Sequence, residues 1–166
     1  MRWTPPKKEV LKVNTDASFD VDTSSGSTGV VVRDYRGAML RGQALWYDHV
    51  SSARVMEAVA IRDGVRLAVE RGYARVIIES DAKEVIQLLD DDELDRSELK
   101  PICQEIRETM RAFPSFSVTF VGRDANQAAH LCARQASSIR RRCLWINYNP
   151  VALASTLLSD CTNVVD

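Results

Sequence analysis

Hydrophobic and polar residues change their period several times along this chain, and each change marks an expected element. Residues 10–16 alternate and predict a β-strand. The stretch 19–27 is rich in turn-forming residues, and 29–33 predicts a second strand. Residues 35–37 then suit a tight hairpin turn before a third strand over 38–46. Three strands joined by short turns predict an antiparallel meander.

A long helix is expected next, over roughly 52–71. Ser51 or Ser52 suits its N-cap, and Gly72 stands where a C′ glycine ends a helix. One stripe at i, i+3, i+4 and i+7 spacing consists of Glu57, Ala60, Ile61, Gly64, Leu67 and Ala68. Its small residues would let the helix lie close to a sheet. Glu57 is an acid on this packed stripe, an unfavourable position unless a cation meets it.

The second half of the chain predicts two strands and three helices. The strands are expected at 75–79 and 117–121, and the helices at 82–89, 97–112 and 125–139. The order βββαβααβα implies an α/β fold with a five-stranded mixed sheet flanked by helices. The antiparallel meander would form one edge, and the parallel strands would be reached through helical crossovers.

Length and composition fit one compact domain of residues 1–166, with 45% hydrophobic and 27% charged residues. We expect a core over about 8–140 and a tail over 141–166 that packs on it or extends from it. The tail holds Trp145 and a weak apolar pattern around 151–158. The acidic stretch 90–95 predicts a solvated loop.

Charge and cysteine usage exclude several classes of protein. A net charge of −1 argues against bulk electrostatic binding of nucleic acid, so any basic surface has to be local. No apolar run approaches a membrane span, and the N-terminus lacks the apolar core of a signal peptide. We therefore expect an intracellular protein of the nucleus or cytoplasm that is not secreted. Four cysteines without paired spacing are expected to be reduced: Cys103, Cys132, Cys143 and Cys161.

Three acids lie at positions from which their side chains could converge on one site. Asp16 ends the first alternating run, Glu57 lies in the long helix, and Asp81 closes the strand predicted at 75–79. In mixed sheets, sites form where the carboxyl ends of neighbouring parallel strands separate. Oxygen ligands that converge there hold hard divalent cations, and a pair of such cations can cut a phosphodiester.

Each acid also has an ordinary structural interpretation. Asp81 and Glu84 match the D-x-x-E pattern of a helix capping box. Asp16 could be a turn residue that accepts backbone hydrogen bonds. Glu57 could pair with Arg54 one helical turn away, although that would not explain its place on the packed stripe. The joint pattern of strand end, helix face and strand end favours a shared site.

In this order, the residues resemble the ribonuclease H-like superfamily and, within it, the plant reverse-transcriptase-like ribonuclease H domains. The resemblance covers about residues 3–160. Its anchors are the segments 12–18, 29–34, 57–58 with 62–65, 78–82 and 121–130.

The resemblance implies a ribonuclease H, a hydrolase acting as an endonuclease on the RNA strand of an RNA–DNA hybrid. The implied cofactor is Mg²⁺, with Mn²⁺ as an alternative. Asp16 would bridge two metal ions, Glu57 would hold one, and Asp81 would help to hold the other. The partner would be an RNA–DNA hybrid or another nucleic acid, recognised by its shape and its 2′-hydroxyls.

The sequence departs from the resemblance at the fourth metal ligand. Many ribonucleases H carry an acid one turn after an asparagine of the last helix, whereas here Asn126 is followed by His130. His130 could ligate metal, hold a metal-bound water, transfer a proton or only pack. Asp124 could act as an auxiliary ligand through the loop. The candidates for backbone and 2′-hydroxyl contacts are Ser18, Ser52, Arg54, Lys83 and Asn126.

A second class of function is a catalytically weak or silent ribonuclease H-like module that binds nucleic acid or protein. The intact Asp16, Glu57 and Asp81 favour the enzyme. The near-neutral charge, the acidic run 90–93 in place of a basic protrusion, and His130 favour the module. The basic cluster 140–142 is expected to be a solvated helix end.

Overall fold

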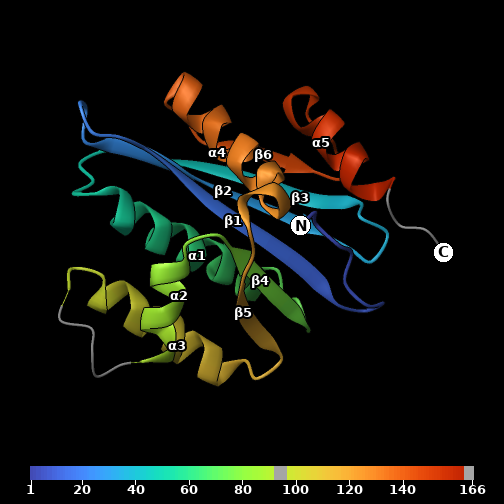
Figure 1. Cartoon of the computed structure of the whole chain (residues 1–166), viewed down its shortest axis with the longest axis horizontal. Coiled ribbons are helices and arrows are strands. Elements are labelled where there is room, and N and C mark those ends of the chain that lie inside the picture. The colour runs from blue at the N-terminus through green and yellow to red at the C-terminus, as the bar shows by residue number, and fades with distance from the viewer. Residues whose placement is uncertain (92–96, 163–166) are drawn as a thin grey trace.

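The computed structural model describes residues 1–91 and 97–162, and within them six strands form one mixed sheet (Figure 1). The strands are β1 (Leu11–Asp20), β2 (Ser25–Arg33), β3 (Met39–Tyr47), β4 (Val76–Ser80), β5 (Phe116–Phe120) and β6 (Cys143–Ile146). They lie in the order β5-β4-β1-β2-β3-β6. Strands β1, β4 and β5 are parallel, and β1, β2, β3 and β6 are antiparallel neighbours.

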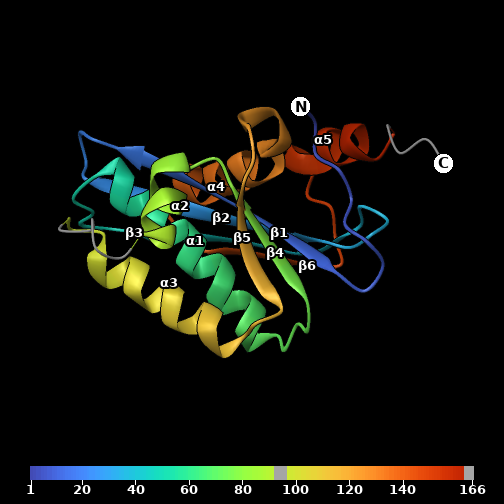
Figure 2. The same cartoon turned by 60° about the horizontal axis from the view of Figure 1, so that its bottom comes forward.

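Helices cover both faces of the sheet (Figures 1 and 2). One face carries α1 (Ala53–Glu70), α2 (Lys83–Asp90) and α3 (Lys100–Ala112), with α3 packed against α1. The other face carries α4 (Gln127–Ile139) and α5 (Val151–Cys161), and a short 3₁₀ helix, η1 (Arg123–Ala125), leads into α4. A buried apolar cluster fills each side of the sheet. The predicted α/β class is confirmed, and the sheet has one strand more than predicted.

The antiparallel meander is confirmed, but its first turn is shorter than predicted. Strand β1 continues to Asp20 and strand β2 begins at Ser25, so the turn between them is confined to residues 21–24. Turn-type residues enter β2 because the helices satisfy their polar groups. Ser27 donates to the Ala133 carbonyl of α4 at 2.7 Å, and Thr28 donates to Asp63 of α1 at 2.7 Å.

Helix α1 follows the prediction closely. The Ser52 side chain accepts the Val55 backbone N–H at 3.2 Å and is the N-cap. Gly72 has φ +68° and ends the helix, as a C′ glycine does. A Cβ added at Gly64 would lie 2.5 Å from Cγ2 of Thr15 in β1. The stripe of small residues therefore does bring α1 close to the sheet.

The C-terminal segment contains two elements that the sequence did not define. Strand β6 pairs antiparallel with the outer edge of β3, where Trp145 stands opposite Gly42. Helix α5 packs beside α4 through the buried Leu153 and Leu157. Four residues are too few to show a reliable alternation, which explains why β6 was missed. The loop predicted at 90–95 falls largely on residues 92–96, which lie outside the described part of the chain.

All four cysteines belong to the described residues, and none of them forms a disulfide. Cys103 and Cys132 are buried, whereas Cys143 and Cys161 are partly exposed. In the described ranges, no helix combines the length and apolarity that crossing a membrane requires.

Candidate metal centre

Asp16 and Asp81 lie where two parallel strands separate. The last register pair between β1 and β4 joins Thr15 to Ser80, and the two acids follow directly. Strand β1 itself runs on to Asp20, paired only with β2. The prediction that Asp16 ends a strand is therefore wrong. The pairing with β4 does end there, which creates the carboxyl-end position where sites form in such sheets.

Glu57 joins these two acids from the second turn of α1. One carboxylate oxygen from each of Asp16, Glu57 and Asp81 lies within 4.8 Å of the other two. The three side chains line a cavity of about 390 Å³ together with Ala17, Arg123, Asn126, Gln127 and His130. The convergence inferred from the sequence is thus present in the structure.

Glu57 is the least compensated of the three acids. Its Oε2 is buried and has no hydrogen-bond partner among the described residues. Arg54 does not pair with it, because Arg54 forms an ion pair with Glu84 at 2.8 Å. Burial and the charges of Asp16 and Asp81 raise the pKa of Glu57 to about 8, and Arg123 opposes this only in part. The predicted Arg54–Glu57 alternative is wrong.

Asp81 does not cap α2. The N-cap of α2 is Ala82, which makes no side-chain capping bond within the described ranges, and its N–H instead donates to Ser80 Oγ at 3.1 Å. The Asp81 carboxylate faces the cavity, where its Oδ1 accepts a long hydrogen bond of 3.4 Å from Nδ2 of Asn126. The capping-box interpretation is therefore wrong.

Asp16 of β1 contacts His130 of α4, which packs on that strand. His130 Nδ1 lies 2.9 Å from Oδ2 of Asp16, and an ionised carboxylate there requires the proton on Nδ1. Burial and the charge of Asp81 raise the pKa of Asp16 to about 6, against the lowering effect of the Ala17 N–H and of His130. The His130 side chain is 47% exposed, so the interpretation of a packing histidine is wrong. Asp16 lies within a strand, so it is not a turn residue either.

The donor set fits a hard divalent cation. Two ionised carboxylates at this separation repel by about 3 kcal/mol at an effective dielectric constant of about 20. Three such acids, with Arg123 as the one arginine among the described residues that line the cavity, leave a negative site that a cation would stabilise. All three side chains offer oxygen, the ligand that Mg²⁺, Ca²⁺ and Mn²⁺ prefer.

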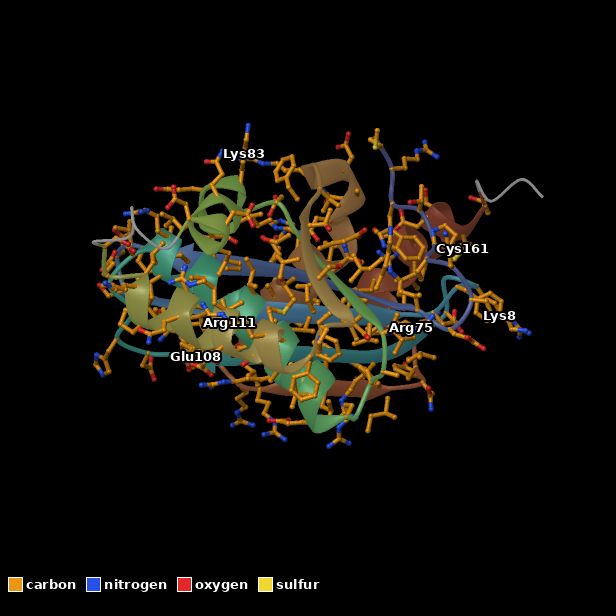
Figure 3. All side chains as sticks on the ribbon, turned by 90° about the horizontal axis from the view of Figure 1, so that it is seen from below. Lys8, Arg75, Lys83, Glu108, Arg111 and Cys161 are labelled. Atoms are coloured by element: carbon orange, nitrogen blue, oxygen red, sulfur yellow. The ribbon has the colours of Figure 1, made fainter. Side chains whose placement is uncertain are left out.

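Most of the residues predicted to contact substrate lie outside the cavity. Asn126 lines the cavity, but Ser18, Ser52, Arg54 and Lys83 are not among the cavity-lining residues. Ser52 is occupied as an N-cap and donates to Glu98 at 2.9 Å. The Lys83 side chain is exposed and extends from α2 away from the body of the protein (Figure 3).

Asp124 is not brought to the acid cluster. Its side chain is 80% exposed, and its carboxylate lies 3.9 Å from the N-terminal ammonium of Met1. Two neighbours that the sequence did not single out, Arg123 and Gln127, do line the cavity. Both lie in the 121–130 segment, but residue type alone did not show which of its polar side chains turn inward.

Solved structures share this architecture. Ribonuclease H1 from the halophilic archaeon Halobacterium salinarum aligns with a TM-score of 0.71 and 18% identity, over 78% of this chain and 98% of that one. The N-terminal ribonuclease H domain of a Mycobacterium tuberculosis protein gives 0.69 and 17%, over 78% and 94%. LC11-RNase H1, solved in complex with an RNA/DNA hybrid, gives 0.70 and 15%, over 78% and 98%. At these identities the likeness shows the fold.

The sheet order and the helices on both faces are thus those of the ribonuclease H fold. The family model described as reverse transcriptase-like matches residues 14–136, and the chain belongs to that family. A search of curated protein sequences found no significant match.

Proposed function

We propose that this protein is a metal-dependent endoribonuclease that cuts the RNA strand of RNA–DNA hybrids. The observation that carries the proposal is the meeting of three carboxylates within 4.8 Å in an open cavity, with one buried oxygen of Glu57 left without a partner among the described residues. A cluster of acids that repel one another costs folding stability, so its presence favours a cationic ligand. Similarity to a ribonuclease H1 solved with an RNA/DNA hybrid supports the choice of substrate.

In this proposal, Asp16, Glu57 and Asp81 hold the metal, with Mg²⁺ as the expected ion and Mn²⁺ as a substitute. Bound divalent ions would supply Lewis-acid stabilisation of the phosphate and a more acidic water. Asp16 contacts His130 and is also near enough to Asp81 for their charges to interact, so it would be the carboxylate best suited to serve two ions.

His130 would act as a proton carrier at the mouth of the cavity. Its Nδ1 is held by Asp16, so Nε2 is the nitrogen at which it would accept or release a proton. The half-exposed position of the ring gives that nitrogen access to solvent and to a departing group. A neutral imidazole carries one nitrogen that donates and one that accepts, so the ring can pass a proton between solvent and a reacting group.

Arg123 and Gln127 are the cavity residues best suited to contact a phosphate or a 2′-hydroxyl. Ser18, Ser52, Arg54 and Lys83 remain candidates for contacts farther along the hybrid. Among these, Ser52 and Arg54 would first have to leave Glu98 and Glu84. Recognition of the hybrid would then depend on its shape and its 2′-hydroxyls.

The test is cleavage of an end-labelled RNA–DNA hybrid by the purified protein in Mg²⁺, in Mn²⁺ and in chelator. RNA–RNA and DNA–DNA duplexes of the same sequence serve as substrate controls. We expect internal cleavage of the RNA strand of the hybrid alone, and none with chelator. An intact hybrid in both metals, with protein shown to be folded, would contradict the proposal.

A second candidate function is a nucleic-acid-binding module without catalysis. The observation that favours it is His130, which offers an imidazole beside the three carboxylates of the cavity, a softer ligand for Mg²⁺ than a fourth carboxylate would be. The same experiment separates the two functions. Binding of the hybrid by gel shift without metal-dependent cleavage would support the module.

A further inference from the structure

A line of buried hydrogen bonds connects helix α5 with the candidate metal centre. Asp160 Oδ2 in α5 accepts from Nη1 of Arg33 at 2.7 Å. Nη2 of Arg33 donates to Oδ1 of Asn14 at 3.2 Å. Nδ2 of Asn14 donates to Oδ1 of Asn126 at 3.2 Å, and Nδ2 of Asn126 reaches Oδ1 of Asp81 at 3.4 Å. We call these five residues the buried relay.

The two ends of the buried relay give it one direction. A guanidinium only donates hydrogen bonds, and an ionised carboxylate only accepts them. Arg33 occupies the oxygen of Asn14, and Glu79 Oε2 accepts from the nitrogen of Asn14 at 2.9 Å, so that nitrogen also faces Asn126. The oxygen of Asn126 is then occupied, so its nitrogen faces Asp81. A flipped amide at either position would set like atoms against each other, and the relay therefore fixes the donor that Asp81 meets.

Arg33 has little freedom to adopt another arrangement. Its side chain is fully buried, and the ring of Trp3 lies over the guanidinium at 3.6 Å. Asn126 is also held, because its Nδ2 donates to the Thr15 carbonyl at 2.9 Å. The beginning of α4 is thereby fixed to β1 at the point where β1 and β4 separate.

Two residues that hold Arg33 lie outside the segment that defines the family. The family model covers residues 14–136, whereas Trp3 and Asp160 come from the two ends of the chain. Both ends therefore converge on one buried arginine whose hydrogen bonds lead to the site.

We infer that Asp160 is a positioning residue for Asp81, acting through Arg33, Asn14 and Asn126, and that α5 is part of the support of the metal centre. The inference rests on the proposed function in treating the acid cluster as a cation site. Partners behind a metal ligand orient it, and their loss weakens metal affinity.

The test uses the full chain with two paired substitutions. Arg33→Met with Asp160→Leu replaces a buried ion pair by apolar side chains of similar size, a change that is often neutral for stability. It removes the donor to the oxygen of Asn14 and leaves Glu79 as the remaining charged partner of that side chain. The matched control is Arg66→Met with Glu105→Leu, which removes the ion pair between α1 and α3. A further variant, Arg33→Lys, keeps the charge opposite Asp160 but lacks the planar fork that serves both partners.

The primary measurement is Mn²⁺ affinity by titration calorimetry, with folding checked by circular dichroism. We expect the Arg33/Asp160 pair to bind Mn²⁺ about tenfold more weakly, and the control pair to bind as the wild type does. In the absence of metal, the side-chain amide protons of Asn126 should exchange faster with solvent in the Arg33/Asp160 pair than in the control. If that pair does not fold, Arg33→Lys is expected to show the weaker affinity.

Wild-type Mn²⁺ affinity and wild-type Asn126 exchange in a folded Arg33/Asp160 pair would overturn the inference. Cleavage by the wild type together with that result would leave the nuclease proposal standing. A wild type that binds Mn²⁺ without cutting the hybrid would overturn the nuclease proposal, and the buried relay would then be judged by affinity and exchange alone.

Discussion

This protein contains two groups of acids that differ in how the chain compensates their charge. In the inner group, Glu79 and Asp160 are buried and meet cations of the chain, Lys12 at 2.6 Å and Arg33 at 2.7 Å. In the outer group, Asp16, Glu57 and Asp81 face one another in an open cavity. The inner acids are neutralised by folding, whereas the outer acids need something from outside the chain. That difference is the strongest physical argument for a cation-dependent function.

The contrast is most informative at Glu79 and Asp81, where the two groups come closest along the chain. Glu79 and Asp81 are two residues apart at the end of β4, and Asn14 and Asp16 are two residues apart in β1. Residues two apart on a strand point to the same face, so the contrast is not one between the two faces of the sheet. It reflects depth: beyond Thr15 and Ser80 the strands separate, and the cavity opens.

The largest expected effect is on catalysis at Asp16. Asp16→Asn keeps the side-chain volume but removes the charge that would hold metal, so cleavage of the hybrid should fall by about a thousandfold or more. That corresponds to the several kcal/mol that metal ions supply to such a transition state. Rates are measured with Mg²⁺ at saturating hybrid. The control is Asp20→Asn, an exposed position of the same strand, which should cleave at the wild-type rate. Wild-type cleavage by Asp16→Asn would place the activity elsewhere.

The next largest effect is on stability in the inner group. Glu79 accepts from Lys12 through Oε1 and from Asn14 through Oε2 at 2.9 Å. Glu79→Gln places an NH₂ group against one of these donors and removes the charge opposite Lys12. The free energy of unfolding in urea should fall by about 3 kcal/mol, as expected when one partner of a buried pair is lost. Glu105→Gln, at a half-exposed ion pair, should cost less than about 1 kcal/mol.

In the outer group, a Glu→Gln substitution should have the opposite effect and raise the free energy of unfolding. Glu57→Gln removes a charge that Asp16 and Asp81 repel, so it should stabilise the metal-free protein by about 1–2 kcal/mol at pH 8 to 9. Urea unfolding in chelator measures this, and Glu70→Gln at the exposed end of α1 is the control. A destabilised Glu57→Gln protein would show that Glu57 has a cationic partner and would end the contrast between the two groups.

The pH dependence of stability should follow from the same acids. The pKa of Asp16 rises from 3.8 to about 6 and that of Glu57 from 4.5 to about 8, mainly because both groups are buried. The folded metal-free protein therefore holds protons that the unfolded chain releases near pH 4. These two groups therefore contribute most to the free energy of unfolding below about pH 4. Their contribution falls as the pH rises to about 8, by at most about 1.4 kcal/mol per pH unit for each group. Thermal unfolding in chelator from pH 5 to 9 measures the slope, which Glu57→Gln should reduce. A flat profile would contradict the raised pKa values.

Much of this arrangement could be predicted from the sequence. Alternation and helical periodicity located the meander and α1, and the small residue at Gly64 correctly indicated close packing on β1. The acids Asp16, Glu57 and Asp81 were found because each stands at an element position that a parallel crossover brings together. These are local patterns combined with one rule of topology.

The remaining features depend on contacts between distant segments. In the sequence, Arg33 is an ordinary polar residue at the end of an apolar strand. Only the fold shows that its guanidinium contacts Asp160, which lies 127 positions later in the chain. The capping interpretation of Asp81 used a local pattern that tertiary contacts overrode. Likewise, Lys83 and Arg54 have the right charge for substrate contacts, but one extends outward and the other is paired with Glu84.

The smallest expected effect concerns His130, which lies at the border of the outer group. Its hydrogen bond lowers the pKa of Asp16, and its exposed ring offers Nε2 for proton transfer. His130→Ala should therefore slow cleavage about tenfold, less than a general acid or base typically contributes, because water can reach the half-exposed position and replace the ring in part. Hybrid binding should be nearly unchanged. His130→Asp adds a fourth oxygen ligand and should bind Mg²⁺ more tightly than His130→Ala and recover cleavage. Arg134→Ala, on the exposed face of α4, is the control. Cleavage by His130→Ala at the wild-type rate would remove His130 from the site and leave the three carboxylates as the whole of the metal centre.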